Sequence, residues 1–224
     1  MSTALRQILT IARKDLRTEL RAASGIITMV LLGFLVVLVF SFSLEPGSRD
    51  SALARSGVLW AAFLFPGLIA VGRSFESEKE VQCLEGLLLC PVDRSIIYLG
   101  KLLSSAILAL VSGFLVLVFF TVLYNVSLGL PWLALLGIIM LAGIGLSAVG
   151  TLAAAITVSV RARGALLTII VLPLLVPLLI GAARCSVALL GADPWALSLW
   201  PWMMVGFDVI FLAVGVAVFD FVVE

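Results

Sequence analysis

Six long apolar segments restrict the folds that this sequence can adopt. They cover residues 25–44, 57–72, 102–124, 132–158, 165–183 and 200–223, with polar connections between them. About 20 apolar residues in a helix cross the roughly 30 Å of bilayer hydrocarbon, and a helix satisfies its own backbone hydrogen bonds there. The sequence therefore predicts an all-α membrane protein, with six transmembrane helices in one domain over residues 1–224.

The composition agrees with a bilayer environment and argues against several functions. Hydrophobic residues make up 63% of the chain and charged residues 12%, whereas soluble domains are about one quarter charged. A net charge of +1 offers no surface for nucleic acid. The chain has no histidine, the commonest metal ligand and general base, and its three cysteines lack metal-site spacing. We expect no catalytic residue, no metal and no cofactor bound by this chain itself.

The basic residues predict the orientation of the spans. Eleven of the 14 Lys and Arg residues fall on the side of both termini, and Arg49, Arg55 and Arg184 fall on the other. The positive-inside rule therefore places both termini in the cytoplasm. The connections on the other side are short and rich in Gly and Pro, so they leave no room for an extracellular domain.

Residues 1–24 predict an amphipathic helix before the first span. One helical face carries Leu5, Ile8, Leu9, Ala12, Leu16 and Leu20. The basic side chains fall elsewhere, at Arg6, Arg13, Lys14, Arg17 and Arg21. This pattern is typical of a helix that lies in the cytoplasmic interface of the lipid bilayer, where basic side chains reach lipid phosphates.

The connection over residues 73–101 is the longest polar segment between two spans, and it is rich in acids. It carries Glu76, Glu78, Glu80 and Glu85. Ser74 can cap a short helix, the glutamates favour its N-terminal end, and Pro91 ends it. Its apolar face is formed by Val81, Leu84, Leu87 and Leu88. Such a helix suits a groove on a cytoplasmic partner. The alternative is a passive connector between the two spans. The glutamates do not share a single helical face, which argues against a metal site.

Small residues predict close helix packing in the fourth span. Gly143, Ser147, Thr151 and Ala155 recur every four residues, a spacing that lets two helix backbones approach closely. The partner helix could belong to the same subunit or to a second copy of the chain in a dimer.

Two further features lie inside the predicted spans. Pro173 and Pro177 each remove a backbone donor from the fifth span, which predicts a kink and suggests a hinge. Asp208 lies about 12 Å along the sixth span from Trp200, where an ionised carboxylate is costly unless it is paired or hydrated. It could face a subunit interface, face a wet cavity or be protonated, and we favour the interface.

Two motifs together resemble the cytochrome c maturation protein B family. The first is Phe75-x4-Glu80-x3-Leu84-Glu85-x-Leu87-Leu88-x2-Pro91, followed by Gly100-Lys101. The second is Thr157-Val158-x2-Arg161-x-Arg163-Gly164-x-Leu166-Leu167, which runs into Val171-Leu172-Pro173-Leu174-x2-Pro177-Leu178-Leu179-Ile180. The six-span layout also fits the family, so that the resemblance covers essentially the whole chain.

The resemblance implies the membrane subunit of an ABC-type haem exporter complex of the bacterial cytoplasmic (inner) membrane. Such subunits form homodimers and bind a cytoplasmic ABC ATPase (CcmA-like), which holds the ATP and Mg²⁺. They assemble with a haem-handling membrane subunit (CcmC-like) and a small single-span subunit (CcmD-like). The complex handles haem and releases a haem-loaded periplasmic chaperone (CcmE-like). The docking residues would then be Glu76, Glu80, Leu84, Glu85, Leu87, Leu88, Pro91, Arg161 and Arg163.

Two other functions fit the same features. An ABC-2 exporter half for a drug or a lipid would share the acidic connection, and a membrane-embedded assembly factor would need no ATPase. The sequence has no G-x-x-x-x-G-K-[ST] motif, so ATP hydrolysis is expected on another chain.

Overall fold

The structure is a computed structural model that describes residues 3–22, 24–44, 51–80, 93–126, 129–157, 163–191 and 199–222. These residues form helices, and no strand occurs among them. In chain order the helices are α1 (Thr3–Ala22), α2 (Ser24–Ser43), α4 (Ala52–Glu80), α6 (Arg94–Tyr124), α7 (Leu130–Ile156), α8 (Arg163–Leu190) and α9 (Trp200–Val222). The predicted all-α membrane fold is confirmed.

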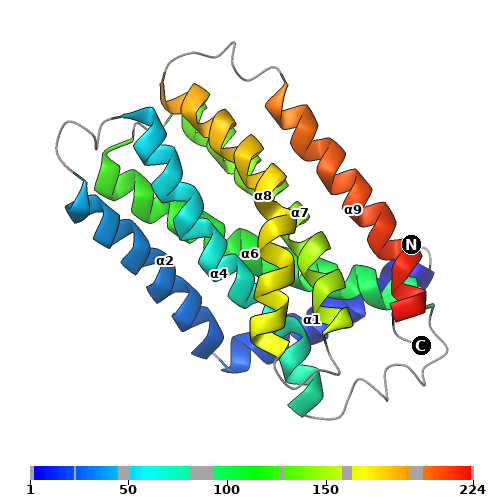
Figure 1. The fold of residues 1–224 in the computed structure, drawn as a ribbon. Coiled ribbons are helices and arrows are strands. Elements are labelled where there is room, and N and C mark those ends of the chain that lie inside the picture. Colours follow the sequence, from blue (N-terminus) through cyan, green and yellow to red (C-terminus); the bar gives the residue numbers. More distant parts are fainter. Residues whose placement is uncertain are drawn as a thin grey trace.

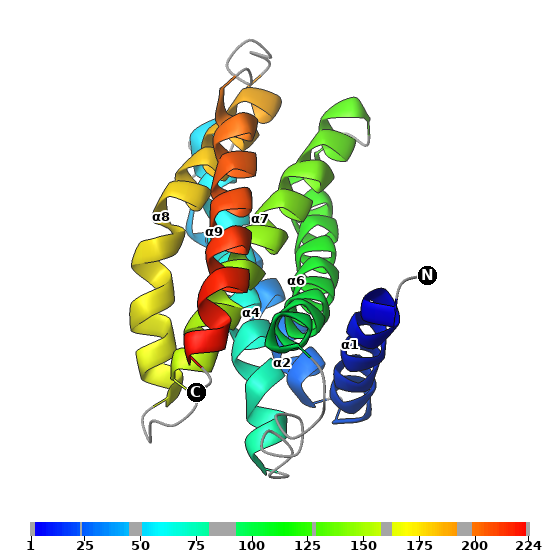
Figure 2. The ribbon, with the colours of Figure 1, turned by 90° about the vertical axis from the view of Figure 1, so that its right-hand side faces the viewer.

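Six of these helices are long and apolar enough to cross a membrane, as the sequence predicts. They are α2, α4, α6, α7, α8 and α9, and the first described helix, α1, stands apart from them. In Figure 1, α1 runs across the direction of α2 and α9, and its first residues lie toward the same end of the bundle as the end of α9. Figure 2 shows α1 beside α6 on the outside of the bundle.

Helix α7 occupies the centre of the bundle. It packs against α4, α6, α8 and α9, while α2 packs against α4 and α6 at one edge (Figures 1 and 2). Small residues make this central position possible, because a Cβ atom on Gly150 would lie 2.5 Å from Cγ1 of Val71 in α4. The close approach brings α4, α7 and α8 into one apolar core.

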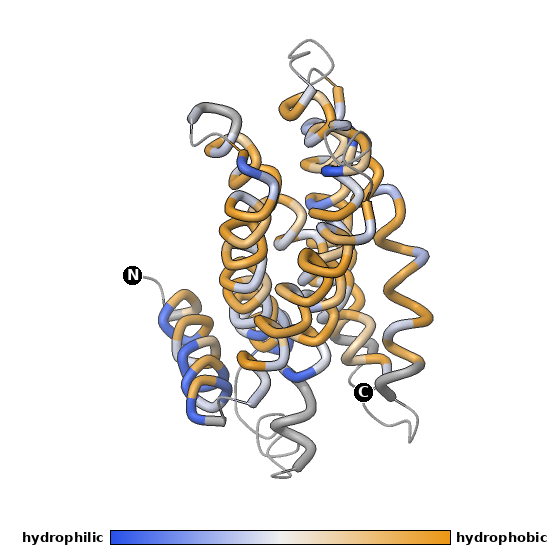
Figure 3. Tube along the Cα trace, turned by 90° about the vertical axis from the view of Figure 1, so that its left-hand side faces the viewer, coloured by the Kyte–Doolittle hydropathy of each residue, from blue (hydrophilic) through white to orange (hydrophobic). Residues whose placement is uncertain are grey.

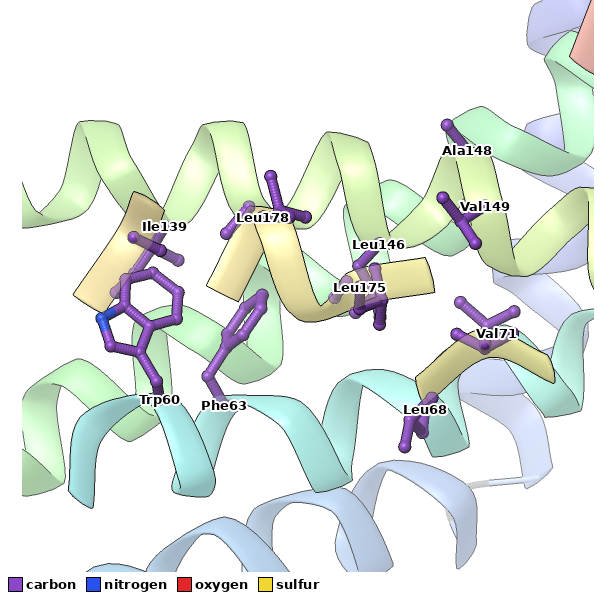
Figure 4. Packing of buried hydrophobic residues seen from close by; sticks show 14 of the residues in the cluster. Trp60, Phe63, Leu68, Val71, Ile139, Leu146, Ala148, Val149, Leu175 and Leu178 are labelled. Carbon is purple, nitrogen blue, oxygen red and sulfur yellow. The ribbon is translucent and has the colours of Figure 1, made fainter. Parts of the chain in front are cut away.

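Figure 4 shows this core from close by. Trp60 and Phe63 of α4 point toward Ile139 of α7 and Leu178 of α8. Nearly all of the surface of these side chains is buried, and the Trp60 Nε1–H donates a 2.9 Å hydrogen bond to Ser186 Oγ of α8. The tryptophan therefore contributes both apolar area and a satisfied polar contact. Figure 3 shows the contrast between the apolar bundle and α1, in which hydrophilic residues alternate with apolar ones.

The stripe of small residues in α7 packs within the chain, against α6. A Cβ atom on Gly143 would lie 3.0 Å from Leu110 Cδ2, and the Thr151 hydroxyl is 3.2 Å from that of Ser105. Ser147 and Ala155 of the same stripe are also buried. Of the two partners that the sequence left open, the structure shows a helix of the same subunit.

The described beginning of the acidic connection has a different form from the one predicted, whereas Val81 and the predicted end of the helix at Pro91 lie outside the described residues. Helix α4 continues without a break through Arg73 to Glu80, and α6 begins at Arg94. Ser74 therefore lies inside α4 and does not cap a separate helix. Lys101 lies two turns inside α6. The helices at both ends of the connection extend beyond their apolar segments. Backbone hydrogen bonds hold a helix together, and polar residues form these bonds as well as apolar residues do.

Candidate functional site

The most unusual feature of the fold is a group of polar side chains, four of them charged, between α1 and the spans, which we call the charged junction. It comprises Asp15 and Glu19 of α1, Arg73 of α4, and Lys101 and Ser104 of α6. Asp15 is 7% exposed and Glu19 is 5% exposed. Since carboxylates are almost never buried unless they are paired, these two need partners.

The first partner of Asp15 is Lys101, whose side chain is fully buried. Lys101 Nζ lies 3.5 Å from Asp15 Oδ2, and Ser104 Oγ lies 3.4 Å from the same oxygen. Lys14 Nζ lies 3.0 Å from the other oxygen, Oδ1. The carboxylate of Asp15 thus joins α1 to α6, two helices whose paired residues are 86 positions apart in the chain.

The second pair joins α1 to α4, because Arg73 Nε donates a hydrogen bond to Glu19 Oε1. Both side chains also lie against Gly25, at the start of α2, where a Cβ atom would collide with them. Glycine at this position therefore allows the close approach of the pair to α2. The two ion pairs connect α1 with α4 and α6, and the second pair also lies against α2.

A close backbone contact supports the ion pairs. A Cβ atom on Gly100 of α6 would lie 2.8 Å from Ile11 Cβ and 3.4 Å from the carbonyl oxygen of Ile8, both in α1. Ala12 of α1 is buried as well. Helices α1 and α6 therefore approach each other closely beside the charged junction.

The charged junction lies at the base of the acidic connection. Glu80 follows Arg73 by seven residues in α4, about 10 Å along a continuous helix, and Lys101 follows the first residue of α6 by the same number. Any movement of the acidic end of α4 would therefore act on a segment that is ion-paired to α1.

All nine predicted docking residues lie outside the described residues or have undescribed side chains. Leu84, Glu85, Leu87, Leu88, Pro91 and Arg161 lie outside the described residues. Glu76 and Glu80 belong to the last two turns of α4, and Arg163 is the first residue of α8, but the structure does not describe these side chains. The docking assignment remains a prediction.

Sequence reasoning missed Asp15 and Glu19. We described α1 by its leucines and its basic residues alone, as a helix of the membrane interface, and Leu5, Leu9 and Leu20 are 47%, 44% and 63% exposed. The two acids are four residues apart and therefore share a face, which a search for paired polar residues would have found. The leucines instead form a second, exposed sector beside the buried one.

Asp208, for which we favour an interface role, lies in the interior of the bundle, and the role stays a prediction. It is 5% exposed, and its Oδ1 atom lies against Gly145 of α7, beside Leu178 of α8. Neither carboxylate oxygen has a hydrogen-bond partner among the described residues. A group of three or more metal-binding side chains does not occur in the described part of the chain either.

Comparison with known proteins identifies the family. The sequence profile of the family described as "CcmB protein" matches residues 6–222. "Heme exporter protein B" of Rhodobacter capsulatus is 33% identical over 174 residues, which cover 76% of this chain and 78% of the relative. The protein of the same name from Paracoccus denitrificans is 30% identical and covers 81% of this chain and 83% of its own length. With a profile match over almost its whole length and relatives at this identity, the chain belongs to the CcmB protein family.

Proposed function

We propose that this chain is the membrane subunit of an ABC-type haem exporter complex that serves cytochrome c biogenesis. Its relatives are named heme exporter protein B, and its six spans suit a permease subunit. The sequence contains no P-loop, so the proposal assigns ATP and Mg²⁺ to a separate ATPase. Haem is handled by the complex, with CcmC-like and CcmD-like subunits beside a homodimer of this chain.

The observation that carries the proposal is the continuity of α4 from the apolar core to its acidic end. Val71 is packed in the core against Gly150, Arg73 is paired with Glu19, and Glu80 ends the same helix. A force on the acidic end would therefore reach both α1 and the centre of the bundle through rigid elements. In this proposal ATP turnover acts on the acidic connection and drives release of the haem-loaded periplasmic chaperone.

Charge reversal in the acidic connection tests the docking. Glu80→Lys together with Glu85→Lys should release the ATPase from the membrane, since like charges across an interface cost several kcal/mol. The measurement is the amount of ATPase that copurifies with this chain in mild detergent, at equal amounts of the chain. The matched control is Asp50→Lys with Asp193→Lys, two acids in connections predicted to lie on the opposite side.

Retention of a stoichiometric ATPase after both glutamate reversals would contradict the docking assignment. The same purification, analysed by mass spectrometry, separates the alternatives. Copurification of haem-handling subunits would support a haem exporter, whereas copurification of an ATPase without them would support an ABC-2 exporter for another substrate. A chain that copurifies with no ATPase would be an assembly factor.

The proline pair of α8 gives a second test. In Figures 1 and 2 the path of α8 bends between its two halves, and both Pro173 and Pro177 lie inside the helix. If this bend is a hinge, Pro173→Ala with Pro177→Ala should lower cytochrome c maturation severalfold, because the restored N–H groups stiffen the helix. Val176→Ala, an exposed position between the prolines, is the control. Full maturation by the double variant would refute the hinge.

A further inference from the structure

We propose that the outer face of α1 is a binding surface for anionic phospholipid headgroups, and that the charged junction creates this surface. Helix α1 contains five basic residues and two acids, so its sequence suggests a mixed charge. Both acids are buried and paired inside the charged junction. The exposed side of α1 is consequently cationic without an interspersed acid.

The basic side chains of α1 gather on one side. Arg6, Arg13, Lys14, Arg17 and Arg21 border an open groove of about 690 Å³ together with Leu9, Thr10 and Thr18. None of the four arginines forms an ion pair with another residue in the part of the chain that the structure describes, whereas Lys14 contacts Asp15. Four guanidinium groups are therefore available to an anion from outside the chain. Guanidinium groups bind phosphate oxygens well because they present several donors in one plane.

The exposed leucines decide between a membrane and a soluble partner. Leu5, Leu9 and Leu20 lie beside the basic side chains and are exposed, while the opposite side of α1 packs on α6. A leaflet offers phosphates directly above hydrocarbon, which matches a basic sector next to an apolar one. The crosswise path of α1 relative to the spans in Figure 1 places the whole helix at one depth of the bundle. These observations favour lipid as the occupant.

Hydrogen exchange of α1 tests this inference without reference to transport. The full chain is placed in nanodiscs of phosphatidylcholine alone or with one third phosphatidylglycerol. We expect the backbone amides of Thr3–Ala22 to exchange more slowly with phosphatidylglycerol, and this protection to weaken at high salt. Arg13→Gln with Arg17→Gln should reduce the phosphatidylglycerol-dependent protection about 30-fold, or about fivefold per arginine.

Arg13→Lys with Arg17→Lys is the matched control, because it keeps both charges and should keep most of the protection. Neither arginine belongs to the charged junction, so the fold of α1 should persist in both variants. Inorganic phosphate added to phosphatidylcholine discs should not replace phosphatidylglycerol, since it offers nothing to the leucines. Equal protection in the two lipids, protection by inorganic phosphate alone, or an unchanged Gln variant would overturn the proposal, as would an effect that requires an added soluble protein.

Discussion

Replacing Asp15 by leucine is expected to destabilise the protein by about 3–5 kcal/mol, the usual cost of removing one partner from a buried ion pair. Lys101 is fully buried and would lose the carboxylate 3.5 Å from its Nζ atom. The measurement is the free energy of unfolding of the purified chain in mixed detergent micelles, from a denaturant titration. We also expect α1 to detach from the bundle before the spans unfold, because α6 is its main packing partner.

The double variant tests the physical reason for this effect. Lys101→Met in the Asp15→Leu background removes the remaining buried charge, so stability should return to within about 1 kcal/mol of the wild type. Lys101→Met alone should cost less than Asp15→Leu alone, because Asp15 keeps its contacts with Lys14 and Ser104. Strictly additive losses of stability in the double variant would show that the two charges do not interact. The charged junction would then not be what holds α1 against the spans.

The second large effect is expected at Gly150, where α7 lies close to α4. Gly150→Val places its Cβ atom 2.5 Å from Cγ1 and 3.1 Å from Cβ of Val71, a fully buried and stiff β-branched side chain. Overpacking of this kind costs about 1–3 kcal/mol or more, because α4 must move away from the core. The free energy of unfolding and the exchange of backbone amides in α4 and α7 would report the loss.

Gly137→Val is the control for this substitution. It lies in the same helix, and outside the adjoining backbone of that helix no described atom lies within 4 Å of the position that its Cβ would take. Its stability should be equal to the wild type or slightly higher, because valine has a better helix propensity than glycine. An equal loss for both variants would mean that the effect comes from helix propensity or from lipid contacts, and that Gly150 is not a packing constraint.

The two effects concern one mechanical unit. Val71 and Arg73 are two residues apart in α4, the first in the apolar core and the second in the charged junction. The acidic end of α4 is therefore connected both to the centre of the bundle and to α1. If the proposed ATPase acts on that end, variants at Asp15 and Gly150 should weaken coupling as well as stability.

Much of the architecture could be predicted from local sequence. The spans could be counted because a helix of about 20 apolar residues crosses the hydrocarbon and satisfies the backbone hydrogen bonds that lipid cannot supply. Each span therefore depends only on residues that are close together in the sequence. The stripe from Gly143 to Ala155 likewise predicted a close helix contact, because small side chains let two helix backbones approach each other. Span limits were less accurate, because polar residues such as those from Arg73 to Glu80 remain helical outside the apolar segment.

The sequence by itself determined an all-α bundle of six membrane-spanning helices preceded by an amphipathic helix, because those properties depend on residues that are neighbours in the chain. Only the tertiary structure decided which charges are buried. Asp15 meets Lys101, Glu19 meets Arg73 across 54 positions, and Asp208 lies against Gly145 without a polar partner among the described residues. Hydropathy places Asp15, Glu19, Arg73 and Lys101 outside the spans, whereas the free energy of a buried charge depends on a partner that long-range packing alone brings within reach.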